Sequence, residues 1–443
     1  MALAREAVEQ LRSDVGTKGK PMAKVELSEE TKAGIEEVRE ADLLIAVAVP
    51  VDTEQLRTVA TKAILGTGQS MLSGLRTVVA FPGPTGVEAP IQATTDLESV
   101  ETPGLRFVPY ALPAASPERI PWLPGASTYQ TLFAMARELG VNACAVIGFD
   151  LAALQTNFLA PMMTAVLEKG CELVMPVYAL GKFDGLLNSS IYAPLTRALY
   201  GRRVRFPLAP DFCLSSKMIP ELELALQRAI AQGQSTFWPA TEAAIRDCTI
   251  CQVNVETRHI PPADAVDLTT VLSQTVGSLY AEMTTHAALW QRTRGSQPVE
   301  TLAVPVAPPA DGAAADTTPM LETFQLGFRN LQEVWSLVLP PVTLLELKRL
   351  ARPSTSRFHL PDELWVRIIY DFALAYRLRT ISRAHLLGAL TPLYLGWVAS
   401  YATEVGNASP AEAEQRLEKL ARAYEEGKPY LLSRWRWPDR FNP

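Results

Sequence analysis

Short apolar runs alternate with helix-length segments over the first half of the chain. The runs occupy residues 43–51, 77–81, 106–112, 143–147 and 173–177. Between these runs, segments 52–65 and 128–140 carry apolar residues at helical spacing. Short apolar strands that alternate with helices predict an α/β domain with a doubly wound sheet.

The pattern also divides the chain into parts. The parts are a helical N-terminal lead-in over 1–40, an α/β domain over 41–298, a linker over 299–319 and an α-helical domain over 320–443. Ser28 is the expected cap of the lead-in helix. The linker is rich in proline and alanine, and nearly everything beyond it has helical spacing. Within the α/β domain we expect a strand over 248–255 and one long helix over 263–292.

Residues 385–403 contain no Asp, Glu, Lys or Arg, and the segment is nearly long enough to cross a membrane. It also holds glycine, proline, threonine and tyrosine, which favours a buried core helix over a membrane span, with peripheral membrane attachment as a weaker alternative. Residues 1–40 are charged and lack the apolar stretch of a signal peptide. We therefore expect a cytoplasmic protein without an integral membrane span.

The net charge of the chain limits which kinds of partner it can bind. The 443 residues carry a net charge of −6, so no broad basic surface is available and nucleic acid is not an expected partner. Residues 197–205 hold four arginines. In an acidic protein such a cluster is more typical of a phosphate or carboxylate clamp, or of a solvated helix end.

The five cysteines are few and uneven in number. Cys248 and Cys251 have the spacing of a metal or redox pair, but there is no second pair of this kind and the segment has the pattern of a strand. A structural role is therefore favoured. We expect reduced thiols, as in other cytoplasmic proteins.

The apolar run at 143–147 is followed by a single carboxylate, Asp150, and the next run begins at residue 173. In α/β sheets ligands bind at the carboxyl ends of the strands. We therefore expect Asp150 to lie near the ligand of this protein.

Several motifs carry a resemblance to a known family. They are the strand that leads to Asp150, PVYxxxKFDG at 176–185, PLTRALYG at 194–201, RFPLAPDF at 205–212 and QVNVETRHIPP at 252–262. The chain resembles glucosyl-3-phosphoglycerate synthases, mannosylglycerate synthases and related glucosylglycerate-forming glycosyltransferases over about residues 41–443. The resemblance implies a GT-A fold, a nucleotide-sugar donor, a divalent metal ion and retention of the anomeric configuration.

The resemblance also implies roles for single residues. Asp150 and His259 match metal-binding positions for Mg²⁺ or Mn²⁺, although a lone histidine is as often a surface or core residue. The positions that match donor or acceptor contacts are Pro50, Asp52, Asp184, Gly185 and Arg197, and those that match catalytic positions are Asp211 and Glu242. Four of them also have a plainer interpretation: an Asp-Gly turn at 184–185, a solvated charge at 197 and a helix cap at 211.

The chain departs from the family pattern at five places. Gly148 replaces the first Asp of the family's Asp-x-Asp, residues 82–86 and 124–127 lack the family's carboxylate and lysine, Ala209–Pro210 replaces a glycine pair, and Glu242 is the one carboxylate of 237–244. Loss of one transition-state contact typically costs ~10²–10³ in rate. We thus expect the fold of the family together with an active site that lacks several of the family's residues.

Two functions follow. The first is a divergent glycosyltransferase that moves a hexose from UDP- or GDP-hexose to a small anionic acceptor such as glycerate or 3-phosphoglycerate. The second is a catalytically inactive relative that acts as a binding or regulatory partner, in a homodimer or with an active paralogue.

Overall fold

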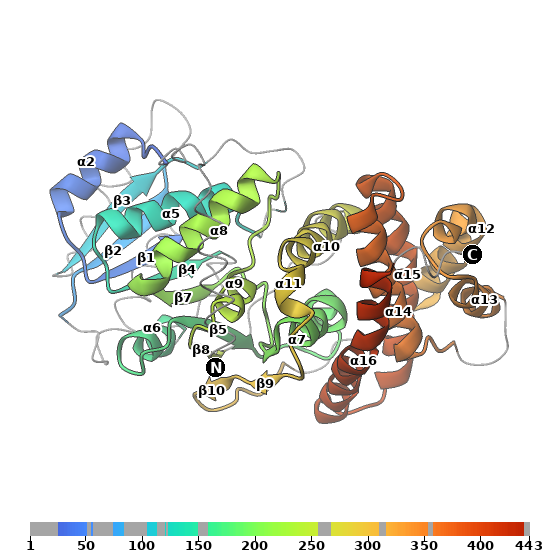
Figure 1. Cartoon of the computed structure of the whole chain (residues 1–443). Helices are drawn as coiled ribbons and strands as arrows, with labels where there is room; N and C mark the ends of the chain where they lie inside the picture. Colours follow the sequence, from blue (N-terminus) through green and yellow to red (C-terminus); the bar gives the residue numbers. More distant parts are fainter. Residues whose placement is uncertain are drawn as a thin grey trace.

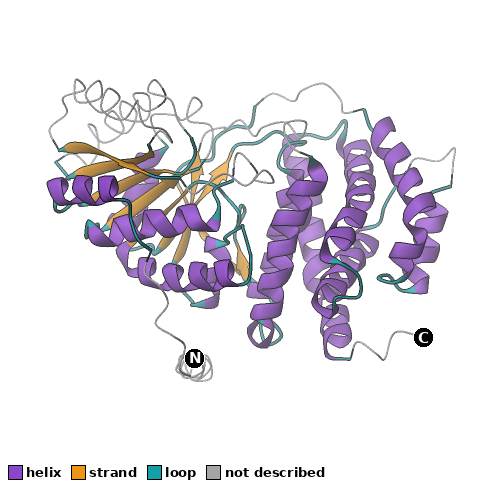
Figure 2. Ribbon diagram, turned by 90° about the horizontal axis from the view of Figure 1, so that it is seen from above, coloured by secondary structure: helices purple, strands orange, loops and turns teal. Residues whose placement is uncertain are grey.

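The computed structural model separates a β-sheet from a group of long helices, which lie side by side (Figures 1 and 2). The structure describes residues 25–50, 55, 74–83, 104–112, 120, 123–148, 158–255, 267–309, 316–352 and 358–437. An α/β domain followed by a helical C-terminal part is the fold class that the sequence predicts, and it is confirmed.

The main sheet has eight strands in the order β10-β8-β5-β7-β4-β1-β2-β3. Their bounds are Leu43–Val47 (β1), Thr77–Pro82 (β2), Leu105–Tyr110 (β3), Ala143–Ile147 (β4), Leu173–Tyr178 (β5), Phe212–Ser215 (β7), Ile250–Val255 (β8) and Glu300–Leu302 (β10). Strand β7 runs antiparallel to both of its neighbours, β4 and β5, and the other pairs in the sheet are parallel. Two short strands, β6 (Arg202–Arg203) and β9 (Gln297–Pro298), form a separate parallel pair.

Helices on both faces of the sheet explain why its central strands are continuous apolar runs. Every residue of β1, β2 and β4 is buried. The helices of this part are α2 (Glu29–Val38), α5 (Ala126–Glu138), α6 (Leu159–Leu167), α8 (Ile219–Ala231) and α9 (Pro239–Ile245). Helices α5 and α8 pack against each other, while α6 contacts β4, β5 and β7. Ser28 caps α2 as expected, because its hydroxyl accepts from the Thr31 amide at 3.2 Å.

A second apolar core lies among the helices. It comprises α12 (Thr318–Ser336), α13 (Pro341–Leu350), α14 (Asp362–Leu378), α15 (Arg383–Val405) and α16 (Pro410–Arg436), together with the π-helix η1 (Asn188–Tyr192), α7 (Ala193–Tyr200), α10 (Leu268–Thr285) and α11 (Ala287–Trp290). The helical core therefore includes segments that precede the expected linker. The single helix predicted over 263–292 is two helices, divided at His286.

The uncharged segment 385–403 lies within α15, and most of its side chains are buried against neighbouring helices. Close packing explains its glycines. A Cβ on Gly396 would lie 2.9 Å from the Phe324 ring, and one on Gly327 would lie 2.5 Å from Pro392. The core-helix interpretation is confirmed. None of the helices in the part of the chain that the structure describes has the length and apolar character needed to cross a membrane.

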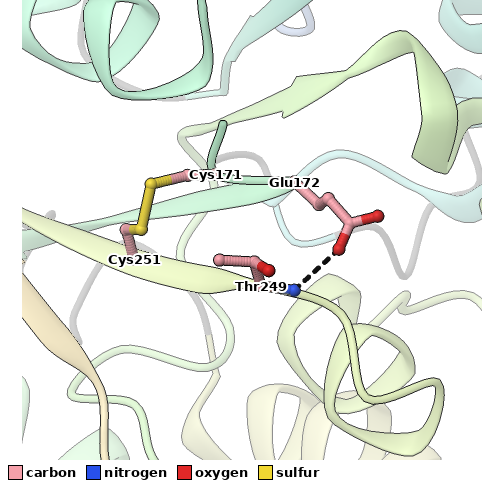
Figure 3. Close-up of a disulfide and its surroundings, with 4 residues drawn as sticks. All are labelled: Cys171, Glu172, Thr249 and Cys251. Carbon is pink, nitrogen blue, oxygen red and sulfur yellow. Dashed lines mark hydrogen bonds between the residues drawn. A yellow bond between two sulfur atoms is a disulfide. The ribbon is translucent and has the colours of Figure 1, made fainter. Parts of the chain in front are cut away.

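The expectation of reduced thiols is wrong for one pair. Cys171, just before β5, forms a disulfide with Cys251 in β8, and their Cα atoms are 5.9 Å apart (Figure 3). Beside it, the Glu172 carboxylate accepts from the Thr249 amide at 2.8 Å. Cys248 remains a thiol, so the Cys-x-x-Cys motif is not a redox pair. A disulfide is unusual in a reducing compartment, and the cytoplasmic location stays a prediction.

Candidate functional site

Asp211 joins the ends of two strands at the carboxyl edge of the parallel sheet. It immediately precedes β7, and its side chain is fully buried. One carboxylate oxygen accepts from the amide of Gly148, after β4, at 3.0 Å. The other accepts from the hydroxyl of Tyr178, at the end of β5, at 2.8 Å. These contacts brace the edge of the sheet where ligands bind in α/β proteins. Asp211 precedes a strand, so the interpretation as a helix cap is wrong, and its catalytic role stays a prediction.

Gly148 occupies a space that admits no side chain. A Cβ at this position would lie 2.4 Å from the carbonyl oxygen of Pro210, 2.8 Å from the Pro210 Cβ and 2.9 Å from the Pro124 Cγ. The aspartate that the family carries here could not fit beside these two prolines. Three of the five positions at which the chain departs from the family pattern therefore lie together around Gly148.

Of four further predicted site residues, the structure describes one. Pro50 follows β1 and is exposed. Asp52, Asp150 and His259 lie outside the described residues. Their roles, including the metal site of Asp150 and His259, stay predictions.

A cavity of about 740 Å³ opens at the carboxyl ends of β5 and β8, and we call it the β5–β8 cavity. Its lining includes four cationic side chains, Lys182, Arg197, Arg203 and Arg205, and α16 forms part of its wall. The cavity thus brings together three of the four arginines of the cluster at 197–205. The lining also contains three carboxylates, Asp184, Glu414 and Glu418, so the four cationic groups exceed the anionic ones by one. The guanidinium groups can pair with a small anionic ligand.

Arg197 is buried and already paired. Its guanidinium donates to Glu418 at 2.6 and 3.1 Å and to Glu425 at 2.8 Å, both on α16. Burial lowers the pKa of Arg197, but the two carboxylates outweigh burial and raise it. An acceptor would have to compete with these carboxylates, so the plain interpretation of a solvated charge is wrong and the acceptor role stays a prediction.

The other cations of the cavity are more open. Arg203 donates to the Ser296 hydroxyl at 2.9 Å and is exposed. Arg205 contacts the Ser189 hydroxyl at 3.2 Å and Glu414 at 2.9 Å. These two guanidinium groups can reorient toward a ligand with less loss than Arg197, because their present partners are hydroxyl groups and one exposed carboxylate.

Asp184 and Gly185 form a tight turn after β5. The Asp184 carboxylate accepts from the Gly181 amide at 3.0 Å, and Gly185 has a φ of +59°, a conformation that favours glycine. Asp184 thus belongs to an Asp-Gly turn, as the plainer interpretation expects, and it also lines the β5–β8 cavity. The exposed carboxylate oxygens leave Asp184 able to accept from a hydroxyl group in the cavity.

Glu242 lies on α9 in a buried charge network, away from the lining of the β5–β8 cavity. It accepts from Arg228 at 2.5 Å and forms a second ion pair with Arg246. His286 lies 3.5 Å from Glu242 and 3.1 Å from Glu282. The contacts of Glu242 are thus those of a buried ion-pair network that stabilises the fold. A catalytic role for Glu242 stays a prediction.

The network sets the protonation of its members. Burial raises the pKa of Glu242, but His286, Arg246 and Arg228 outweigh burial and hold it below the usual range. Burial lowers the pKa of His286, but Glu242 and Glu282 outweigh burial and raise it. Both groups are therefore stabilised in their charged forms.

Glu242, Glu282 and His286 have ligand atoms close enough together to hold a metal ion. The fit is poor, however, because both oxygens of Glu242 already bind a guanidinium group and a divalent cation would meet two positive charges. The group is better described as an ion-pair network. No further cluster of three potential metal ligands occurs among the described residues.

Sequence reasoning missed several of these residues. Glu282 and His286 stand four apart at the end of one helix, a spacing that places them on one face and could have indicated their contact. Lys182 lies inside the KFDG motif, which was the signal that could have indicated it as a cavity residue. No local signal indicated Glu418 or Glu425, because they approach Arg197 only through the packing of α16 on α7.

Comparison with known proteins gives partial likenesses. No family model and no curated protein matches the sequence. Among solved structures, the chain is similar to one described as a mycobacterial protein, with 16% identity, a TM-score of 0.36, and coverage of 56% of this chain and 76% of that one. It is also similar to the M. tuberculosis glucosyl-3-phosphoglycerate synthase, with 17% identity, a TM-score of 0.33, and coverage of 58% and 86%.

Proposed function

We propose that this protein is a divergent, nucleotide-sugar-dependent glycosyltransferase that transfers a hexose, with retention of configuration, to a small anionic acceptor such as glycerate or 3-phosphoglycerate. The observation that carries the proposal is the β5–β8 cavity, which lies at the carboxyl edge of the sheet and is lined by Lys182, Arg203 and Arg205. Guanidinium groups bind carboxylates and phosphates through paired hydrogen bonds, so they match such an acceptor. The sequence motifs at 176–212 support the same assignment, because they line or border this cavity.

Asp150 and His259 would hold the Mg²⁺ or Mn²⁺ ion of this enzyme. The metal ion would neutralise the nucleoside diphosphate as it leaves the sugar. Asp211 would keep the strand ends in place through Gly148 and Tyr178, and Arg203 and Arg205 would orient the acceptor anion. UDP-hexose and GDP-hexose are the donors to test.

A second candidate function is a catalytically inactive relative that binds a ligand or a partner without turnover. The packing of Pro124 and Pro210 against Gly148 favours it, because this packing fills the place of a family carboxylate. The pairing of Arg197 with α16 favours it as well, since the guanidinium is not free for an acceptor.

The first experiment titrates UDP-glucose, GDP-glucose and GDP-mannose into the protein by calorimetry, with and without Mn²⁺. We expect metal-dependent binding of one donor and loss of that binding in the Asp150→Ala variant. Asp316→Ala, an exposed carboxylate ahead of α12, is the matched control and should bind as wild type. Unchanged affinity in Asp150→Ala would contradict the metal role. No binding of any donor by the wild type would favour the inactive relative.

The second experiment tests the acceptor cavity with the donor that binds. The Arg203→Gln/Arg205→Gln variant should raise the KM for glycerate or 3-phosphoglycerate at least about tenfold while donor affinity stays unchanged. Arg329→Gln/Arg349→Gln removes the same charge from exposed positions on α12 and α13 and should have no effect. An equal KM in all three proteins would rule out the cavity as the acceptor site.

A further inference from the structure

A second groove lies between the sheet domain and the helical core. Its volume is about 930 Å³, within the range of small-molecule sites. The start of α5 and the loop after α8 form one wall, and α10 with the α14–α15 connection forms the other. We call it the α5–α15 groove. It shares no lining residue with the β5–β8 cavity.

The lining of the α5–α15 groove is polar but not acidic. Serine, threonine and glutamine side chains recur along it, among them Ser127, Gln234, Ser273 and Thr284. None of the described residues that line it is an aspartate or glutamate, although the chain has 47 of them. A groove with hydroxyl and amide groups and no carboxylate is suited to an anionic, hydrogen-bonding ligand.

Two arginines supply positive charge at one side of the groove. Arg379 and Arg383 are both exposed, and neither forms an ion pair with any residue that the structure describes. The Arg383 guanidinium lies over the Tyr376 ring, 4.1 Å from its centre. Stacking of this kind holds a guanidinium in place while its N–H groups stay available to an anion.

The opposite wall adds two polar groups that lack protein partners within the described ranges, a hydroxyl group and an amide oxygen that can accept from a ligand hydroxyl. The Thr128 side chain is 1% exposed, and its hydroxyl has no hydrogen-bond partner within the described ranges. The Gln234 side-chain oxygen is also buried without a partner there. Thr128 belongs to the first turn of α5, whose positive end of the helix dipole is near the groove. Unpaired buried polar groups are costly, which indicates that this wall is built to contact something besides protein.

We propose that the α5–α15 groove binds a small phosphorylated molecule, with its phosphate held by Arg379 and Arg383 and its hydroxyl groups bonded to the serine, threonine and glutamine side chains. Guanidinium groups bind phosphate oxygens through paired, charge-assisted hydrogen bonds, which are roughly twice as strong as hydrogen bonds between neutral groups. The site does not depend on the proposed glycosyl transfer. An active and an inactive relative could both use it.

The test uses inorganic pyrophosphate as the probe, titrated by calorimetry into the full chain in the presence of EDTA, so that metal-dependent donor binding does not contribute. We expect the wild type to bind pyrophosphate and Arg379→Gln/Arg383→Gln to bind it at least about tenfold more weakly. The charge-matched control is Arg329→Gln/Arg349→Gln, whose exposed arginines lie outside the groove.

Each outcome decides the proposal. Loss of binding in Arg379→Gln/Arg383→Gln and retention in the control support it. Equal loss in both variants would mean nonspecific attraction between charges, and absence of binding in the wild type would mean that the groove takes no phosphate; either result overturns the proposal. Thermal unfolding of each variant shows whether the fold is intact, and both altered arginines are exposed. Donor binding with Mn²⁺, measured on the same variants, separates this result from failure of the glycosyltransferase proposal.

Discussion

Substitution of Gly148 by alanine tests the packing at the carboxyl edge of the sheet. The new methyl group would lie 2.4 Å from the Pro210 carbonyl oxygen and within 2.9 Å of carbon atoms of Pro210 and Pro124. Non-bonded carbon atoms normally stay about 3.5–4.0 Å apart, so the backbone must move. Overpacking of this degree costs up to about 3 kcal/mol. Alanine also lowers the conformational entropy of the unfolded chain, which stabilises the folded protein by about 0.4–1 kcal/mol. The free energy of unfolding should therefore fall by about 2 kcal/mol.

Hydrogen exchange measured on peptides from β4 and β7 is a suitable assay, because these strands lie beside Gly148. A loss of about 2 kcal/mol would speed the exchange of their slowest amides about thirtyfold. Gly148→Ala should cost less when it is made in a Pro210→Gly background, with Pro210→Gly alone as the reference, since the backbone there becomes free to shift. Gly388→Ala is the control, because its methyl group would meet its nearest neighbour, Thr269, at 3.7 Å. Wild-type exchange rates in Gly148→Ala, or a cost of Gly148→Ala that is equally large in the Pro210→Gly background, would refute the reasoning.

Three further predictions concern charges and the disulfide. Arg197→Met should lower the free energy of unfolding by about 2–3 kcal/mol, because two carboxylates of α16 lose their partner, whereas Arg422→Met at an exposed pair should change it by less than about 1 kcal/mol; urea unfolding measures both. The stability that His286 contributes should be fully present below about pH 6.5, the value of an unfolded histidine, and should be lost as the pH rises through its raised folded pKa. The difference in unfolding free energy between wild type and His286→Gln should therefore shrink with rising pH, and a difference that grows would contradict the assignment. Changing Cys171 and Cys251 to serine should cost about 2–5 kcal/mol, since the bond closes a loop across a sequence separation of 80; an unchanged melting temperature after reduction would contradict this.

The strands could be predicted because their apolar runs are short, buried on both faces and separated by helical spacing. The run at 143–147 is an example, since it coincides with β4. Contacts between distant segments could not be predicted. The Cys171–Cys251 disulfide depends on β5 and β8 lying side by side, which follows from the strand order and not from the Cys-x-x-Cys motif.

The candidate site divides in the same way. The KFDG turn and the arginine cluster at 197–205 were visible in the sequence, and they do line one cavity. The pairing of Arg197 with Glu418 was not visible, because 221 residues separate them and the contact arises only when α16 packs on α7. Burial of Glu242 between two arginines was hidden for a similar reason, since Arg228 comes from another helix.

The packing around Gly148 changes how the departures from the family pattern should be interpreted. In the sequence alone, the five departures are separate, among them Gly148 and the prolines at 124 and 210. Each would then lower the rate of glycosyl transfer independently. In the structure, Gly148 lies beside both prolines, so substitutions at these three positions are expected to have non-additive effects. Three of the departures therefore belong to one local packing arrangement at the carboxyl edge of the sheet. In this packing the Asp211 carboxylate accepts from the Gly148 amide, and the nearby β5–β8 cavity has a cationic lining, so the carboxyl edge of the sheet is an ordered surface even without a carboxylate at position 148.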